Sequence, residues 1–122
     1  MKKVQDIYKA LGDYGCLLLC YLQEACVKVD IVKHFEKLVE LGIIDNDCYI
    51  NDANRLLKYF GSDKRVARGT NDIGNTIVPF CYDKNEHFVV VNDRQEIVFN
   101  SLENSTCVRL GEPNWEKARY LV

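Results

Sequence analysis

The sequence has no apolar run long enough to cross a membrane and no excess of positive charge. Its longest apolar run is the segment 16–22, whereas a membrane-spanning helix needs about 20 residues. Sixteen lysines and arginines face eighteen aspartates and glutamates, which gives a net charge of −2. Electrostatic binding to nucleic acid is therefore not expected. The polar start at 1–6 lacks the apolar stretch of a signal peptide. These absences predict a cytoplasmic protein without a membrane or nucleic-acid partner.

The chain contains six cysteines but lacks the patterns by which cysteines usually bind zinc or form a disulfide scaffold. No two of them form a C-x2-C pair, the spacing of common zinc sites, and the cytosol keeps thiols reduced. Cys16 and Cys20 lie four residues apart and could share a metal with His87. A metal-binding or redox protein is therefore one alternative, but the main interpretation needs no metal and no cofactor.

Five of the cysteines are expected to be unreactive. Four have apolar neighbours along the chain: Cys20, Cys26, Cys81 and Cys107. A free cysteine in such surroundings often packs as a small hydrophobic residue in the core. Cys48 lies among acidic residues, which raise the pKa of a thiol and make it a poor nucleophile. Cys16 differs from these five because it follows a turn and begins a helix.

The composition and the spacing of apolar residues predict a single α+β domain over residues 1–122. Hydrophobic residues make up 48% of the chain and charged residues 28%, which is an ordinary globular balance. Helical patterns fill the first half and strand patterns the second. The expected helices span 3–10, about 16–27, and segments that begin at Asp30 and at Asn51 or Asp52. The expected strands span 76–82, 87–92, 96–101 and 118–122.

Two segments have a more particular interpretation. The helix at about 16–27 is apolar nearly all round over its first two turns, which predicts a buried central helix. The turn at 12–15, Gly-Asp-Tyr-Gly, is expected to separate it from the first helix. The segment 61–76 is typical of a surface loop. The basic side chains in and just before it form either an anion-binding patch or simply a solvated face: Arg55, Lys58, Lys64, Arg65 and Arg68.

The hairpin around 92–95 is expected to place a histidine beside an asparagine. If Asp93 and Arg94 are the central residues of its turn, His87 faces Asn100 across the two strands. The carboxamide oxygen can accept a hydrogen bond from one ring N–H, which leaves the other ring nitrogen free to act as a base. A bulge in either strand would break this count.

Cys16 can supply the nucleophile that this pair lacks. It begins the buried helix directly after a turn, and the unpaired N–H groups and dipole of a helix start favour the thiolate. A protonated His87 would favour the thiolate further. Cys16, His87 and Asn100 therefore form a candidate Cys-His-Asn triad.

Three short motifs in this order resemble the papain-like cysteine peptidase superfamily. They are Tyr-Gly-Cys at 14–16, His-Phe-Val-Val-Val at 87–91 and Asn-Ser at 100–101. Within the superfamily the chain is most similar to the small bacterial branch that includes the bacteriocin-processing peptidases. Residues 41–50 also resemble an uncharacterised family of prophage- and plasmid-borne bacterial proteins given this fold. The resemblance implies N-terminal helices, one of them buried and bearing the cysteine, packed on a C-terminal antiparallel sheet.

The resemblance also implies roles for the three residues. Cys16 would be the nucleophile, His87 the base and Asn100 the residue that orients the ring. Together they would form a thiol hydrolase of peptide or isopeptide bonds with a peptide or protein substrate.

The sequence departs from the superfamily at one position. Papain-like peptidases usually carry a Gln about six residues before the cysteine, where it donates to the oxyanion, and here that residue is Ala10. Gln5, if the turn brings it round, and Tyr14 are the candidate substitutes. The alternative function is a catalytically degenerate papain-like interaction module of phage or plasmid origin.

Overall fold

The computed structural model describes residues 3–122. Met1 and Lys2, part of the polar start that argues against an export signal, lie outside the described residues. The first half is helical and contains α1 (Val4–Tyr14), α2 (Cys16–Glu24), α3 (Ile31–Glu40) and α4 (Ala53–Tyr59). The second half contains β1 (Val66–Arg68), β2 (Thr76–Tyr82), β3 (Asn85–Val91), β4 (Ile97–Phe99), α5 (Thr106–Leu110), β5 (Glu112–Pro113), the 3-10 helix η1 (Trp115–Lys117) and β6 (Arg119–Leu121). The α+β class is therefore confirmed.

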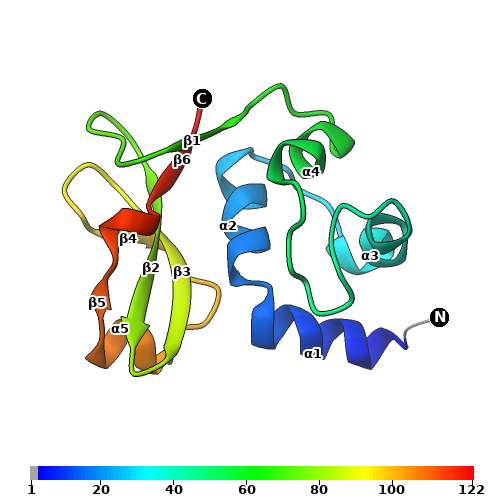
Figure 1. Cartoon of the computed structure of the whole chain (residues 1–122), viewed down its shortest axis with the longest axis horizontal. Helices are drawn as coiled ribbons and strands as arrows, with labels where there is room; N and C mark the ends of the chain where they lie inside the picture. The colour runs from blue at the N-terminus through cyan, green and yellow to red at the C-terminus, as the bar shows by residue number, and fades with distance from the viewer. Residues whose placement is uncertain (1–2) are drawn as a thin grey trace.

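The strands form one antiparallel sheet in the order β1-β6-β2-β3-β4, and β5 pairs with β2 beside this path. Figure 1 shows the sheet on one side of the molecule, α3 and α4 on the other, and α2 between them. The described helices include none that is long and apolar enough to cross a membrane.

Local capping explains where two of the helices begin. The Asp30 side chain accepts a hydrogen bond from the Val32 N–H at the start of α3, and Asp52 accepts one from the Arg55 N–H at the start of α4. Such caps satisfy N–H groups that have no partner within the helix. Gly42 follows α3 with φ +73, a conformation that suits glycine. The sequence prediction is confirmed at both caps.

The junction of α1 and α2 differs from the expectation. α1 does not stop at residue 10 but continues through Gly12 to Tyr14, where the N–H of Gly15 still bonds to the carbonyl of Leu11. α2 then starts directly at Cys16 and ends at Glu24, three residues earlier than expected. The turn that would have brought Gln5 round is therefore absent, and one glycine joins the two helices.

The core lies on both faces of the sheet. The larger cluster packs α1, α2, α3 and α4 against the β2 and β3 residues Ile77, Phe88 and Val90. The smaller one contains Val78, Val89, Val91 and Ala118, with Trp115 at its edge. Residues 88–91 of β3 are therefore buried throughout, as the apolar run His-Phe-Val-Val-Val predicts.

The cysteines are less uniformly buried than expected. Cys20 and Cys107 are buried and Cys81 is half-buried, but Cys26 is exposed. Because α2 ends before it, Cys26 lies in the connecting turn with φ +56 instead of on the buried helix face. Cys48 is buried.

Three features of the second half were not predicted. β1 lies within the segment expected to be a loop, and it forms because residues 66–68 pair with 119–121 at the other end of the chain. β5 is a two-residue strand that pairs with β2. α5 carries a recognisable signal, because the Ser105 side chain accepts a hydrogen bond from the Val108 N–H at its start.

Candidate active site

His87 and Asn100 meet through their side chains. The Nε2 atom of His87 in β3 lies 2.7 Å from Oδ1 of Asn100, which follows the last residue of β4. His87 is buried, with 7% of its surface exposed, and Asn100 is half-buried. The expected contact between imidazole and carboxamide is therefore present.

The hairpin reaches this contact by a different register from the one expected. Its loop has three residues instead of two, with Gln95 at φ +64, so that Val91 faces Ile97. A bulge then shifts the pairing by another residue, and Val90 faces Phe99. Because side chains alternate between faces, two one-residue shifts return the asparagine to the face of the histidine.

A second hydrogen bond determines the tautomer of the ring. The backbone N–H of Leu102 donates to Asn100 Oδ1 at 3.0 Å, so this atom of the carboxamide is the oxygen, an acceptor. His87 Nε2 must then carry the proton that it shares with Asn100. In the neutral ring, Nδ1 is left with a lone pair and can accept a proton.

Cys16 lies beside the strand that bears the histidine. The backbone N–H of Phe88 donates to Cys16 Sγ at 3.5 Å, and the carbonyl of Phe88 accepts from Cys20 Sγ at 3.5 Å. Phe88 faces Pro79 in β2, and its backbone N–H and C=O both point away from that strand. β3 pairs with β4 only from Val90 onward, so α2 covers this stretch of strand edge with two thiols.

The electrostatic setting of Cys16 corrects one expectation. Burial raises the pKa of the Cys16 thiol, while the backbone N–H groups of Phe88 and Leu17 oppose the rise. Nearby Glu86 raises the pKa further. The helix start thus favours the thiolate, but desolvation outweighs it. The resting form is a neutral thiol, which needs a base to become a nucleophile.

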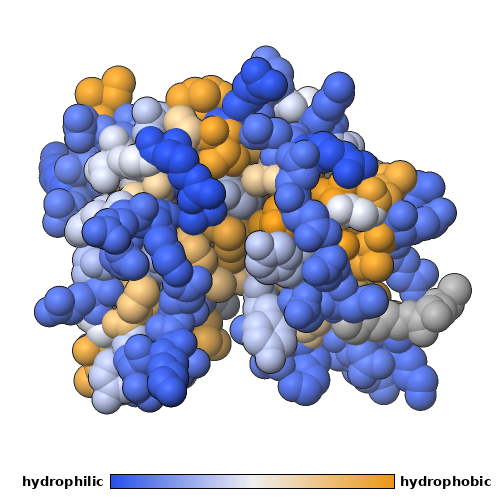
Figure 2. All heavy atoms as spheres, in the orientation of Figure 1, coloured by the Kyte–Doolittle hydropathy of each residue, from blue (hydrophilic) through white to orange (hydrophobic). Residues whose placement is uncertain are grey.

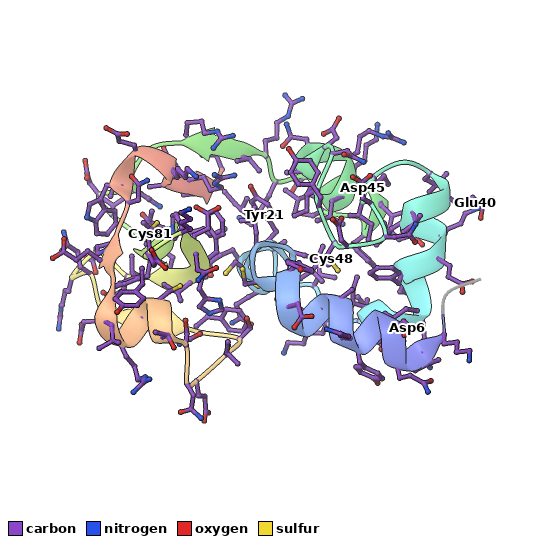
Figure 3. The ribbon with its side chains drawn as sticks, turned by 60° about the horizontal axis from the view of Figure 1, so that its bottom comes forward. Asp6, Tyr21, Glu40, Asp45, Cys48 and Cys81 are labelled. Atoms are coloured by element: carbon purple, nitrogen blue, oxygen red, sulfur yellow. The ribbon has the colours of Figure 1, made fainter. Side chains whose placement is uncertain are left out.

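A cleft of about 600 Å³ opens beside Cys16 between the helices and the sheet. In Figure 2 the molecule is hollowed between these two halves. The helical wall comprises the end of α1, the start of α2 and residues 47–50, and the sheet wall comprises Arg68, Glu86, Phe88, Lys117 and Arg119. Figure 3 places Cys48 on the helical side and Tyr21 between α2 and the strands. Cys16 is half-buried and can be reached from this cleft.

The two substitute oxyanion donors have different positions. Gln5 is exposed in the first turn of α1, nine residues before the end of that helix, and it is not among the residues that line the cleft. At 1.5 Å per residue this places it about 13 Å from Tyr14 along the axis. Tyr14 is 64% exposed at the end of α1 and lines the cleft beside Cys16. Tyr14 remains a candidate, and Gln5 does not.

The metal alternative finds no support in the described part of the chain. Residues 3–122 contain no group of three or more histidine, cysteine, aspartate or glutamate side chains arranged to hold a metal ion. Cys16 and Cys20 both contact the backbone of Phe88 rather than converging on one point.

The cleft also contains residues that the sequence did not single out as a site. Arg119 lies on its sheet wall because β6 pairs between β1 and β2. The apolar pattern of 118–122 predicts the strand but not its neighbours. Of the two arginines on the sheet wall, the sequence singled out only Arg68, as part of a basic loop rather than as a cleft residue.

These observations define a small α+β protein in which a thiol that lines a cleft contacts the backbone N–H of Phe88. The residue before Phe88 is a histidine whose ring is bound by an asparagine carboxamide, and neither of these two side chains lines the cleft. A family model described as "Protein of unknown function, DUF261" matches residues 2–112, and the chain belongs to this family. No curated protein matches the chain, and no solved structure matches it.

Proposed function

We propose that the protein is a thiol hydrolase of amide bonds, with Cys16 as nucleophile, His87 as base and Asn100 as the residue that orients the ring. One observation carries the proposal. The 2.7 Å bond from His87 Nε2 to Asn100 Oδ1 leaves Nδ1 as the basic atom, and the next residue along the strand holds the Cys16 sulfur through its backbone N–H. The substrate class is a peptide or isopeptide.

The chemistry requires only the substrate and water. Cys16 Sγ attacks the amide carbon as its proton passes to His87 Nδ1, and a carbon–sulfur bond forms. The carbon–nitrogen bond then breaks, and the imidazolium returns the proton to the leaving amine. Water hydrolyses the thioester by the same route and regenerates the thiol. Because the resting Cys16 is neutral, His87 acts as a general base and not as the partner of a preformed thiolate.

The arrangement of elements also favours a papain-like fold. A buried helix that begins with the cysteine packs against the strand that bears the histidine, and the asparagine follows the next strand. Helices precede the antiparallel sheet along the chain. We infer the papain-like relationship from this order of residues on these elements.

Two donors are available for the oxyanion in place of the usual glutamine. The first is the backbone N–H of Cys16 itself, in the first turn of α2, where N–H groups have no partner within the helix. The second is the hydroxyl of Tyr14, which lines the same cleft. Each donor aimed at an oxyanion contributes roughly 10²–10³ in rate.

The alternative, a degenerate interaction module, is favoured by a different observation. Gln5 is remote from the cleft, and burial raises the pKa of the nucleophile. Such a module would keep the fold and bind a partner without cleaving it.

Cleavage of a library of internally quenched peptides separates the two functions. We expect the wild-type chain to release fluorescence and Cys16→Ala to release none. His87→Gln should lower the rate by about 10²–10⁴, the usual contribution of general base catalysis. Cys26→Ala is a matched control because this thiol is exposed, follows the end of α2 and does not line the cleft. Equal turnover by wild type and Cys16→Ala, or none by either, would favour the interaction module.

A further inference from the structure

Two arginines stand directly opposite each other on the sheet wall of the cleft. The antiparallel pairing of β1 and β6 places Arg68 across from Arg119, and both line the cleft that Cys16 lines. Opposed residues share one face of the sheet, with Cβ atoms about 4.5–5.5 Å apart, and like charges in this arrangement repel. The repulsion between these two positive charges therefore lowers the stability of the fold.

The Arg119 guanidinium is held in one orientation. Its Nη1 donates to the Tyr21 hydroxyl at 3.2 Å, and Nε and Nη2 donate to the Lys117 carbonyl at 3.2 and 3.1 Å. Its central carbon lies 5.1 Å from the centre of the Phe88 ring. These contacts use three of the five N–H donors of an arginine and leave two for a ligand. The group is therefore positioned before any ligand arrives.

The other charges of the cleft do not neutralise this pair. Glu86 pairs with Lys117 at 3.0 Å, and Asp13 pairs with Lys9 at 2.7 Å. Asp47, the third carboxylate of the cleft, lies on the helical wall and accepts a hydrogen bond from the Tyr49 N–H at 3.4 Å. Among residues 3–122, neither Arg68 nor Arg119 forms a salt bridge with a carboxylate. Positive charge is left uncompensated on the sheet wall.

The distance from the nucleophile sets the length of ligand that would reach the pair. Arg119 contacts Tyr21, which lies five residues after Cys16 in α2 and so about 7.5 Å further along the helix axis. It also contacts Phe88, whose N–H contacts the Cys16 sulfur. An extended peptide covers about 3.3–3.6 Å per residue, so the pair lies about two residues from the reacting carbon.

We propose that Arg68 and Arg119 form a carboxylate-binding subsite, so that the protein takes peptides with a carboxylate about two residues from the scissile amide. An arginine fork matches a carboxylate with two parallel hydrogen bonds. A C-terminal carboxylate and an acidic side chain offer the same group. The proposal rests on the proposed function for the role of Cys16, but its charge preference can be measured without turnover.

Paired thiol reagents test the subsite. Iodoacetyl-glycyl-glycine carries a carboxylate two residues from the reacting carbon, and its primary amide is a neutral twin. We expect the acid to modify Cys16 about fivefold or more faster than the amide at low salt, with a smaller ratio at high salt. Iodoacetyl-glycyl-aspartic acid α-amide, which carries its only carboxylate on a side chain, distinguishes the two sources.

For each variant, the rates of modification by the acid and by the amide are measured on the same protein. A general change in Cys16 reactivity therefore cancels from the ratio of the two rates. Arg68→Gln should bring the ratio close to one, whereas Lys58→Gln removes an exposed charge outside the cleft and should keep it. Because Arg119 has structural contacts, Arg119→Lys is used in place of a neutral variant, with a thermal melt to verify folding. It should lower the ratio without abolishing it. An unchanged ratio in Arg68→Gln, or an equal fall in Lys58→Gln, would overturn the subsite.

Failure of the proposed function gives a different result. If neither reagent modifies Cys16 in the native protein, the thiol is not an accessible nucleophile, and the hydrolase proposal falls. The subsite is then tested by titrating the wild-type chain and Arg68→Gln with acetyl-glycyl-glycine and with its amide, following the arginine Nε–H signals by NMR. Tighter binding of the acid by the wild type alone would support the subsite, and equal binding would overturn it.

Discussion

At the scale of single residues, the candidate site depends on how protons are distributed among three side chains. The Leu102 N–H determines which atom of the Asn100 carboxamide faces His87, and this in turn determines which ring nitrogen carries the proton. Burial raises the pKa of the Cys16 thiol, so this side chain keeps its proton at neutral pH. In the proposed mechanism the lone pair of His87 Nδ1 accepts the Cys16 proton, which is general base catalysis.

The raised pKa of Cys16 predicts how its reactivity depends on pH. Only the thiolate reacts with iodoacetamide. With the folded pKa above its ordinary value of 9.0, the alkylation rate should keep rising from pH 7 to pH 9. A thiolate–imidazolium pair would instead give a plateau that begins well below pH 7. Rates measured by mass spectrometry of the Cys16 peptide distinguish the two, and a flat profile would contradict the general-base assignment.

Asn100→Ala tests the orienting role. The substitution removes the acceptor of His87 Nε2, so the ring is free to change tautomer and rotate. We expect iodoacetamide alkylation of Cys16 at pH 7 to slow several-fold and the free energy of unfolding to fall by about 1–2 kcal/mol, because a buried donor loses its partner. Asn92→Ala, in the turn of the same hairpin, is the control for a lost side-chain bond that does not touch the ring. Equal rates in wild type and Asn100→Ala would rule out the orienting role.

Cys20 predicts a loss of stability in alkaline solution. Its thiol is buried, and burial strongly raises its pKa. In the unfolded chain it ionises near its ordinary pKa of 9.0, so proton release favours unfolding as the pH rises above that value. The free energy of unfolding from urea titrations should therefore fall between pH 8 and pH 10. The fall should be smaller in Cys20→Ala, which lacks this ionisation, and an identical fall in both proteins would contradict the assignment.

At the scale of elements, the candidate nucleophile is positioned by a junction of two helices. Gly15 ends α1 and precedes Cys16 without an intervening loop. A Cβ atom at Gly15 would lie 2.5 Å from the Leu11 carbonyl oxygen. Close packing therefore requires glycine at this position, and the contact helps to set where Cys16 begins α2.

Replacing Gly12 in α1 or Gly15 at its end by alanine should have opposite effects on the free energy of unfolding. Gly12 is inside the helix, and an added Cβ meets nothing within 4 Å, so Gly12→Ala should stabilise the protein by about 0.5–1 kcal/mol. Gly15→Ala should destabilise it by about 1–3 kcal/mol because the backbone must move to relieve the clash. Urea titrations give both values. Equal effects would show that the junction can relax freely.

At the scale of the whole molecule, the last strand connects the helical half to the sheet. β6 lies between β1 and β2, and its Leu121 packs against the larger core cluster. The same strand brings Arg119 to the cleft. Stability and the composition of the cleft therefore depend on one short segment at the end of the chain.

Leu121 and Val122 form a matched pair for this dependence. Leu121→Asp places a carboxylate against the core and should lower the free energy of unfolding by about 2–4 kcal/mol. Val122→Asp adds the same charge at a residue that is 61% exposed and should change it by no more than about 0.5 kcal/mol. Thermal melts compare the two. Similar losses for both would mean that β6 contributes charge balance rather than packing.

The helices and the central hairpin could be predicted because their determinants are close together in the sequence. Asp30 and Asp52 cap helices within a few residues of themselves, and β2 spans exactly the expected residues 76–82. The pairing of His87 with Asn100 was predicted from a turn, since only thirteen residues separate them. Its register was not, because a third loop residue and a bulge depend on packing.

Contacts between distant segments were decided by the tertiary structure. The hydrogen bond between Cys16 and Phe88 spans 72 residues, and the pairing of Arg68 with Arg119 joins strands that have no common local signal. The elimination of Gln5 likewise follows from α1 being continuous. The sequence by itself determined which residues begin helices and which alternate along a strand, because propensities and caps act locally. Which of them share a cleft depended on long-range burial and strand pairing, and only the folded chain specifies those.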